Sequence, residues 1–445
     1  MSNPVASDQR PGSAPLGVPS KTRYFVVVFA VILAIIQYID RVAISQAAPL
    51  ISKDLGLSDV QMGLVFSAFT LAYAAFEIPT GYWGDRIGAR RILIRVVLWW
   101  SFFTAATGWV WNFASLIGVR FLFGVGEAGC FPNIARAFSR WLPIDERARA
   151  QGILWMFARW GGAITPPLLL ILLKYINWRT AFSVFGLLGV VWCVFWFRWY
   201  RDTPADHPSV NAAELALLPA AAPGKSDHPH VPWVVMFSSA SLWLLWVQYF
   251  TLSYAWYFFV TWFPTYLLRV HHYDMKSQGA LIAGVLAGLP LFFGGFGSLL
   301  AGYITPAITR MTGSVRTTRS ILGFSGQALA GCCLLLATTM QQPIWAVLSI
   351  ALASFFNDIT MPGSWTTCMD IGGKYTGTVS GAMNMMGNFG GVVSPSVLGY
   401  IIYKTGDWNL TFYLTAGLYF VGATCWLFIN STKPLPQDAV AVTGL

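Results

Sequence analysis

The stretch that decides the fold is "QGILWMFARWGGAITPPLL" (151–169), because "SGAMNMMGNFGGVVSPSVL" (380–398) repeats its pattern 229 residues later. Identical positions at this offset include Gly152, Met156, Gly161, Gly162 and Pro166. With the offset increased by one residue, the repeat continues: Trp178 and Phe182 match Trp408 and Phe412. Small residues alone could reflect helix packing in a membrane. A shared offset across two adjacent segments instead predicts an internal duplication.

The composition is that of a membrane protein. Of the 445 residues, 56% are hydrophobic and only 10% are charged, with a mean hydropathy of +0.58. A soluble globular protein carries about a quarter charged residues. The net charge of +10 comes from arginines and lysines in the loops, so topology explains it better than binding to nucleic acid.

Twelve segments have about the 20 residues that a membrane-crossing helix needs. They are 24–48, 60–80, 92–112, 114–138, 149–173, 179–199, 237–267, 279–304, 318–340, 343–366, 377–402 and 408–430. We therefore predict an all-α polytopic membrane protein with two pseudo-symmetric six-helix bundles. A parallel duplication of this kind predicts a substrate site between the halves near the midplane.

The expected domains are a disordered N-terminus (1–23), an N-terminal bundle (24–200), a polar linker (201–233), a C-terminal bundle (234–430) and a tail (431–445). With both termini placed in the cytoplasm, 18 loop arginines and lysines lie inside and 6 outside. We predict this orientation in the cell inner membrane. No cleavable signal peptide is visible.

Catalytic and cofactor motifs are missing from the sequence. It has no G-x-x-x-x-G-K-[ST] phosphate loop, no H-E-x-x-H, no metal-spaced Cys/His cluster and no G-x-S-x-G elbow. We therefore expect no ATP-driven pump, no enzyme, no cofactor and no metal site.

Four motifs resemble a known family. "GYWGDRIGARR" (81–91) is similar to the signature loop of the major facilitator superfamily. "YIDRVAISQAAP" (38–49), "RFLFGVGEAGCFP" (120–132) and "NMMGN" (384–388) resemble its anion:cation symporter branch, which includes bacterial D-galactonate:proton symporters, sialin and vesicular glutamate transporters. The resemblance covers all twelve segments, and it implies proton-coupled transport of an organic anion.

Charges in the first and fourth segments form a candidate coupling site. Arg120 and Glu127 are seven residues apart and so share one helix face, whereas the adjacent Asp40 and Arg41 point roughly 100° apart. Their depths predict two acids and two arginines around one cavity. Charge at this depth is costly and usually functional. A static buried ion network is the alternative.

The resemblance adds roles for these charges. We hypothesise that Asp40 and Glu127 take up protons, because separating a carboxylate from its arginine partner or desolvating it favours protonation. The resemblance implies that the matching acids couple protons and that Arg41 binds the substrate carboxylate. Arg120 joins Arg41 as a candidate substrate-binding residue.

Arg159, near the midplane of the fifth segment, departs from the family pattern. In the galactonate transporters a substrate-binding glutamine falls about here, by alignment on Ala158, and the repeat mate of Arg159 is Asn388. Arginine binds carboxylates bidentately and stays charged. It leaves the site with excess positive charge and predicts an anion, or a dianion such as an aldarate. Two interpretations stay open: Arg159 contacts substrate, or it pairs with an acid such as Glu127.

Further residues match positions that face the sugar acid in the family. They are Tyr38, Tyr73, Ser364, Trp365, Asn384 and Asn388. Amide and hydroxyl groups suit substrate hydroxyls, and aromatic faces suit a carbon skeleton. Helix packing or a place at the membrane interface is the alternative for any single aromatic. Tyr254 and Tyr257 are additional candidates for lining the cavity.

The loop 81–91 has a different predicted role. Gly81 and Gly88 permit tight turns and close helix approach, and Asp85 can cap a neighbouring helix. The resemblance implies that the loop, with its residues Gly81, Asp85, Arg86, Gly88 and Arg90, latches the inner gate shut. Alternatively, the arginines only set topology. Glu77 is a candidate latch partner, and Asp358 and Asp370, placed near the inner end of the tenth segment, have no assigned role.

The sequence thus predicts a monomeric secondary transporter that moves a sugar acid (hexonate, hexuronate or aldarate) with protons by alternating access. The alternatives are an antiporter or facilitator for another organic or phosphorylated anion, and a transporter-like receptor. The intact Asp40/Glu127 pair, the intact loop and the short tails argue against a receptor.

Overall fold

The computed structural model describes residues 17–219, 233–263, 266–267 and 279–435. The rest of the predicted N-terminus, linker and tail lies outside these ranges. The long helices are α1 (Thr22–Leu55), α2 (Asp59–Ile87), α3 (Ala89–Thr107), α4 (Phe113–Glu127), α5 (Cys130–Trp141), α6 (Ile144–Leu172), α7 (Trp178–Trp199), α10 (Ala240–Thr261), α12 (Gly279–Thr312), α13 (Val315–Thr339), α14 (Pro343–Gly372), α15 (Thr376–Thr405) and α16 (Asn409–Phe428). The short ones are η1 (Pro204–Asp206), α8 (Ala212–Leu217), α9 (Trp233–Ser238) and η2 (Gly373–Tyr375).

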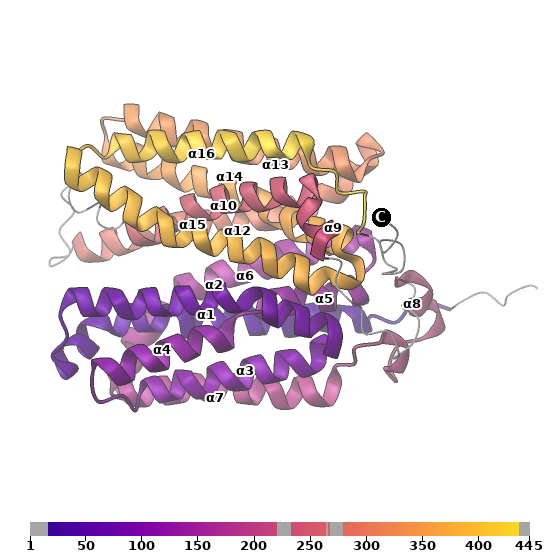
Figure 1. The fold of residues 1–445 in the computed structure, drawn as a ribbon, viewed down its shortest axis with the longest axis horizontal. Coiled ribbons are helices and arrows are strands. Elements are labelled where there is room, and N and C mark those ends of the chain that lie inside the picture. The colour runs from indigo at the N-terminus through magenta and orange to yellow at the C-terminus, as the bar shows by residue number, and fades with distance from the viewer. Residues whose placement is uncertain (1–16, 220–232, 264–265, 268–278, 436–445) are drawn as a thin grey trace, which may run out of the picture.

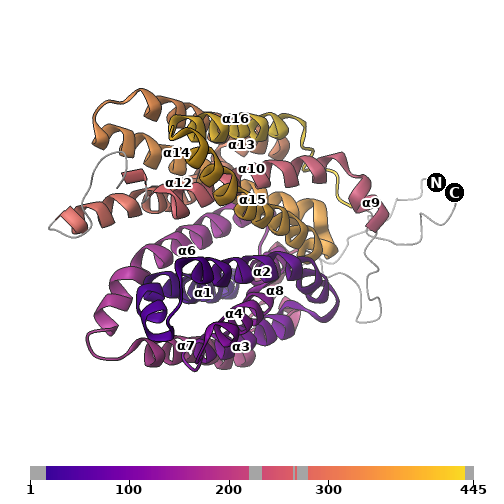
Figure 2. The same cartoon turned by 60° about the vertical axis from the view of Figure 1, so that its left-hand side comes forward.

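The helices form two layers, one from each half of the chain (Figure 1). Helices α1 to α7 make one layer and α10 to α16 the other, and Figure 2 shows the same separation from another side. Each half contributes six long membrane helices, because α4 and α5 together make one interrupted helix. Within the described residues, eight stretches are long and apolar enough to cross a membrane. The chain is a multi-pass membrane protein with the predicted twelve-helix, two-bundle fold.

The fourth predicted helix is broken, which the sequence analysis missed. α4 ends at Glu127 and α5 begins at Cys130, with Gly129 in the left-handed conformation at φ 83°. The Gly129 carbonyl accepts from the Asn133 backbone amide at 3.1 Å and from the Asn133 side chain at 2.7 Å, which ties the break to the start of α5. Glycine is needed here because a left-handed backbone disfavours a side chain. The break places Glu127 at a helix end in the middle of the layer.

The two halves touch closely at one end of the molecule, which we call the α2–α3 end. The Asp85 carboxylate, from the α2–α3 turn, accepts hydrogen bonds from the Gly377 and Thr378 backbone amides at 2.9 and 2.7 Å. These amides belong to the first turn of α15, where a negative charge is favourable. Asp85 therefore caps a helix of the other half, and Arg136 of α5 pairs with it at 2.6 Å.

Glycines let the backbones of the halves meet at this end. A Cβ added to Gly377 would lie 2.5 Å from the Gly81 carbonyl, and one added to Gly302 would lie 2.9 Å from the Ala148 carbonyl. The first contact joins α2 to α15 and the second joins α12 to α6. These two contacts are equivalent under the internal duplication. In each of them the second membrane helix of one half meets the fifth membrane helix of the other half.

Ion pairs complete the closure. Asp370 of α14 binds Arg147 of α6 at 3.0 Å across the halves and also binds Arg319 of its own half. Within the loop, Arg86 and Arg90 bond inside the N-terminal half, to the Tyr82 hydroxyl and the Phe197 carbonyl.

Among the described residues, the bonds between the halves extend from the α2–α3 end to about mid-depth. Trp160, which stacks on Phe292 of the other half at 5.7 Å, lies about 24 Å along α6 from its start. Between described residues, no hydrogen bond, ion pair or ring contact joins the halves beyond this level toward the α1–α2 turn. The halves are therefore joined from mid-depth to the α2–α3 end.

The linker is bound to the N-terminal half through Glu214 of α8. The buried Glu214 carboxylate accepts from the Thr22 and Arg23 backbone amides at 3.2 and 3.0 Å and from the Arg23 guanidinium at 3.1 Å. Arg23 also pairs with Glu146 at the start of α6. Burial alone would raise the pKa of Glu214, but the hydrogen bonds from Ser20 and Arg23 outweigh it and hold the pKa below its ordinary value.

Replacing Glu214 should destabilise the fold. Glu214→Ala leaves two backbone amides and one edge of Arg23 without their acceptor, and breaking a buried ion pair costs about 3–5 kcal/mol. We expect a loss near the lower limit of that range, because Arg23 keeps Glu146. Thermal unfolding in detergent measures it. Asp54→Ala, at a half-exposed ion pair with Arg179, is the control and should cost about 0–1 kcal/mol.

The same carboxylate should make stability depend on pH. Because the pKa of Glu214 is lowered in the folded state, its contribution to the free energy of unfolding is fully present above the unfolded pKa of about 4.3. That contribution is lost as the pH falls through the folded pKa. Equal unfolding temperatures for Glu214→Ala and Asp54→Ala at neutral pH would contradict this account.

Candidate functional site

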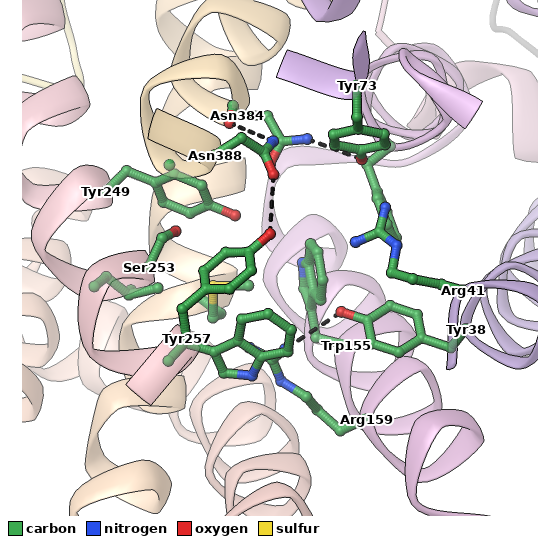
Figure 3. Close-up of a pocket in the computed structure, with 15 residues that line it drawn as sticks. Tyr38, Arg41, Tyr73, Trp155, Arg159, Tyr249, Ser253, Tyr257, Asn384 and Asn388 are labelled. Atoms are coloured by element: carbon green, nitrogen blue, oxygen red, sulfur yellow. Dashed lines mark hydrogen bonds between the residues drawn. The ribbon is translucent and has the colours of Figure 1, made fainter. Parts of the chain in front are cut away.

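A cavity of about 420 Å³, including space open to solvent, lies between the halves above the closed end (Figure 3). Its lining is aromatic and polar and comes from both halves: Tyr38, Arg41, Tyr73, Phe131, Trp155, Arg159, Tyr249, Leu252, Ser253, Trp256, Tyr257, Met361, Asn384, Gly387 and Asn388. The site therefore lies where the duplication predicted it.

Arg41 presents its guanidinium to this cavity. It pairs with the fully buried Glu127 at 2.8 Å and lies 4.6 Å from the centre of the Tyr73 ring. Figure 3 shows Arg41 beside Tyr73 and facing the side chains of the other half. The helix break after Glu127 is what brings this carboxylate level with Arg41.

Asp40 and Arg120 lie elsewhere. Asp40 is 1% exposed inside the N-terminal half, and Arg120, also 1% exposed, lies 4.1 Å from the Phe123 ring centre. Neither residue lines the cavity. The expectation of four charges around one cavity was wrong: the 100° between Asp40 and Arg41 separates a cavity-facing arginine from an acid buried behind it.

Arg159 lines the cavity and pairs with a residue that the sequence analysis left unassigned. Its Nε and Nη2 donate to the two oxygens of Asp358 at 2.7 and 3.1 Å, and its Nη1 donates to the Tyr38 hydroxyl at 3.3 Å. Arg159 thus pairs with an acid, as one of the two interpretations expected, but the acid is Asp358, because Glu127 binds Arg41. Asp358 lies mid-way along α14 rather than near its inner end, and it cancels the excess charge expected from Arg159.

The C-terminal half supplies amides and hydroxyls. Asn388 accepts a hydrogen bond from the Tyr257 hydroxyl at 3.3 Å, and Asn384 donates to the Tyr73 hydroxyl at 3.2 Å across the halves (Figure 3). Tyr257 lines the cavity, whereas Tyr254 does not. The sequence analysis missed Tyr249 and Ser253, although both share with Tyr257 the four-residue spacing of one helix face.

Ser364 and Trp365 lie behind the lining. The Trp365 indole donates to the Tyr249 hydroxyl at 3.1 Å, and Ser364 accepts from Gln248 at 3.0 Å. Six of the nine predicted substrate-binding residues therefore line the cavity, namely Tyr38, Arg41, Tyr73, Arg159, Asn384 and Asn388, whereas Arg120, Ser364 and Trp365 do not.

Glu77 lies behind the cavity lining, where it binds Asn384, and its side chain makes no bond to the latch loop 81–91 among the described residues. It is fully buried, and its carboxylate accepts from Asn384 of the other half at 2.7 Å. Within the described part of the chain, no group of three or more His, Cys, Asp and Glu side chains could hold a metal ion.

Two six-helix bundles around a central polar cavity that is sealed at one end are the architecture of a membrane carrier. Residues 30–395 match the family model of the Major Facilitator Superfamily, and the chain belongs to that family. It is a transporter rather than an enzyme.

Several relatives align over nearly the whole chain. The probable sulfoacetate transporter SauU of Cupriavidus necator is 38% identical over 415 residues, which cover 92% of this chain and 94% of the relative. The hexuronate transporter of Bacillus subtilis is 30% identical, with 90% and 92% covered. The probable galactarate/D-glucarate transporter GudP of Escherichia coli is also 30% identical, with 94% of each covered.

Solved structures agree on the fold. The proton:xylose symporter XylE has a TM-score of 0.72 at 13% identity and covers 93% of this chain and 97% of that one. The human organic anion transporter MFSD10 has a TM-score of 0.70 at 16% identity, with 92% and 100% covered.

Arg41 offers a direct test of the cavity. Arg41→Lys keeps the charge but loses the planar fork that holds a carboxylate through two hydrogen bonds. We expect the substrate Kd to rise at least tenfold, and Arg41→Ala to abolish binding, as measured by ligand-induced thermal stabilisation. Arg179→Lys, which lies at the half-exposed ion pair with Asp54, is the control. Unchanged stabilisation by substrate in Arg41→Ala would remove Arg41 from the binding site.

Proposed function

We propose that this transporter imports a small organic anion together with protons by alternating access. The observation that carries the proposal is that two arginines, Arg41 and Arg159, face one central cavity from the N-terminal half. Arginine is suited to binding carboxylate and sulfonate groups. The relatives named above move sulfoacetate, hexuronates, galactarate or glucarate according to their names. Sugar acids and sulfoacetate are therefore the substrates that we propose to test.

The Arg41–Glu127 pair suggests how a proton and a carboxylate are coupled. An ionised Glu127 occupies the guanidinium edge that a substrate carboxylate needs. A protonated Glu127 releases that edge, and the substrate then replaces it as the partner of Arg41. Proton and anion therefore bind together, because either alone leaves an unpaired charge in a site where that is costly.

We assign a supporting role to the second acid, Asp40. It is buried with Arg120 in the N-terminal half, without contact with the cavity. In this proposal Asp40 is an intermediate site for the same proton that Glu127 takes up, linked to it electrostatically through Arg120, and it does not meet the substrate. Arg120 then acts as a positioning residue and not as a ligand.

The orientation follows from the loop charges. We propose that the α2–α3 end lies in the cytoplasm, with both termini, in the inner membrane, because that side holds most loop arginines and lysines. The structure then represents a state closed toward the cytoplasm, with Gly81 and Asp85 as the cross-half latch. In that latch Gly88 shapes the turn, while Arg86 and Arg90 support it from within the N-terminal half.

A monomer suffices for this cycle, since both halves of the site come from one chain.

Uptake into proteoliposomes tests the proposal. An inward proton gradient is imposed on vesicles with sulfoacetate, glucarate, glucuronate, galactonate, gluconate, phthalate or glycerol phosphate outside. We expect accumulation of at least one sugar acid or of sulfoacetate above the external concentration. Equilibration without accumulation would overturn symport in favour of a facilitator. Ligand-induced thermal stabilisation without flux would favour a receptor.

Glu127→Gln separates coupling from binding. The amide mimics the protonated acid, so we expect substrate exchange between the two sides to continue while accumulation driven by the proton gradient is lost. Counterflow and gradient-driven uptake measure the two properties. Glu146→Gln, at the partly exposed pair with Arg23, is the control and should retain both. Normal accumulation by Glu127→Gln would remove Glu127 from proton coupling.

A further inference from the structure

The ion pair between Arg159 and Asp358 spans the two halves at the level of the cavity. Asp358 is fully buried, and Arg159 is 3% exposed. Both carboxylate oxygens accept from the same guanidinium, at 2.7 and 3.1 Å. The pair differs from the closing contacts at the α2–α3 end because one of its members also lines the cavity.

Asp358 depends on Arg159 for its charge. Its other hydrogen bond at the carboxylate comes from the neutral Asn357 side chain at 2.8 Å. Helix α12 presents Gly294, where an added Cβ would lie 2.7 Å from the carboxylate, and α16 presents Tyr419 as the titratable group. Among the described residues Arg159 is the cation paired with Asp358. An ionised Asp358 without Arg159 would be a buried, uncompensated charge, which is strongly unfavourable.

Arg159 meanwhile faces the substrate space. Its Nη1 donates to the Tyr38 hydroxyl, and its guanidinium lies 4.6 Å from the Trp256 ring centre. Tyr249 and Tyr257 of α10 are the other titratable groups that face it across the cavity (Figure 3). The Arg159 guanidinium therefore pairs with Asp358 and is also within reach of an anionic group in the cavity.

Charge balance in the cavity separates monoanions from dianions. The pairs Arg41–Glu127 and Arg159–Asp358 are each neutral. One proton on Glu127 balances a substrate with one anionic group. A substrate with two anionic groups would still leave one negative charge in a buried site, and an ion there is costly unless it is compensated.

We propose that Asp358 accepts a second proton when the bound substrate carries two anionic groups, so that a dianion moves with two protons and a monoanion with one. The second anionic group takes over the Arg159 hydrogen bonds, and the proton forms an O–H bond on Asp358. Two negative and two positive charges then cross together. On the far side the proton leaves, and the Arg159–Asp358 pair forms again. This inference rests on the proposed proton symport.

The experiment measures net charge movement in proteoliposomes. Glucarate is the dianion and glucuronate the monoanion, and potassium with valinomycin sets the membrane potential at a fixed pH gradient. In the wild type we expect the accumulation of both to be independent of potential, because each moves without net charge. In Asp358→Asn the positive charge of Arg159 stays in the cavity without a carboxylate partner, and it balances one of the two negative charges of glucarate. Glucarate then needs only the proton on Glu127, and each transport cycle moves one net negative charge. Its accumulation should then change about tenfold per 59 mV, with inside-positive potential favouring uptake.

Control variants isolate the role of Asp358. Asp54→Asn makes the same replacement at a half-exposed ion pair away from the cavity and should behave like the wild type. Glu77→Gln removes the other buried carboxylate beside the cavity. If Glu77→Gln makes glucarate uptake potential-dependent and Asp358→Asn does not, the second proton binds to Glu77 and the proposal is overturned.

A second variant covers the case in which Asp358→Asn does not fold. The double change Arg159→Gln with Asp358→Asn removes both charges and keeps the cavity neutral. We expect glucarate uptake to fall at least tenfold, while glucuronate still moves with one proton. Equal retention of both substrates would overturn the proposal.

The two proposals fail in different ways. Wild-type glucarate uptake that is proton-driven and also increased by inside-positive potential would overturn the role of Asp358 and leave symport intact. Lack of proton-driven uptake for both substrates would overturn the symport itself.

Discussion

The central cavity depends on the requirement that the charges facing it be paired. Each arginine that faces the cavity has one carboxylate as its partner: Arg41 has Glu127, and Arg159 has Asp358. The first pair lies within one half, and the second joins the halves. In our proposal an anion that enters replaces a carboxylate as the arginine's partner, because an unpaired buried ion is so costly, and the displaced carboxylate takes up a proton. Pairing would thus link substrate binding to protonation at the level of the side chains.

Closure of the α2–α3 end follows from a different constraint, the close approach of helix backbones. Gly81 meets Gly377, and Gly302 meets Ala148, in two contacts related by the duplication. The Asp85 carboxylate fixes the relative orientation of α2 and α15, because it accepts hydrogen bonds only where the first-turn amides of α15 point at it. Apolar packing adds to these polar contacts, because the Trp365 ring of α14 lies 6.0 Å from the Phe131 ring and 5.5 Å from the Trp155 ring of the other half. The closure therefore combines backbone contact, hydrogen bonds and aromatic packing.

The repeat was sufficient to predict the two bundles and the central cavity. Helix spacing gave the 100° between Asp40 and Arg41, but the prediction that both charges lie around the cavity was wrong. The repeat and the helix spacing were not sufficient to predict the partner of Arg159, because Asp358 is 199 residues away and the pairing depends on how the halves meet. The break at Gly129 was also missed, since glycine within an apolar segment is ordinary in membrane helices. Tyr249 and Ser253 did carry a signal, the four-residue spacing that they share with Tyr257, but in a helix so rich in aromatics that spacing does not distinguish a cavity face from a packing face.

The position of Arg159 explains why one scaffold can serve anions of different charge. A neutral residue at this position would leave Asp358 a buried carboxylate without a cation, so the arginine and the aspartate have to be present or absent together. Present together, they add no net charge and so do not repel a monoanion. Yet they hold a second guanidinium at the wall of the cavity, beside Tyr38 and Trp256, where a second anionic group can reach it. In our proposal the range of anions accepted is therefore set by how easily Asp358 gives up its partner. That is a property of α14 and of the space at Gly294 of α12 rather than of the residues that touch the substrate.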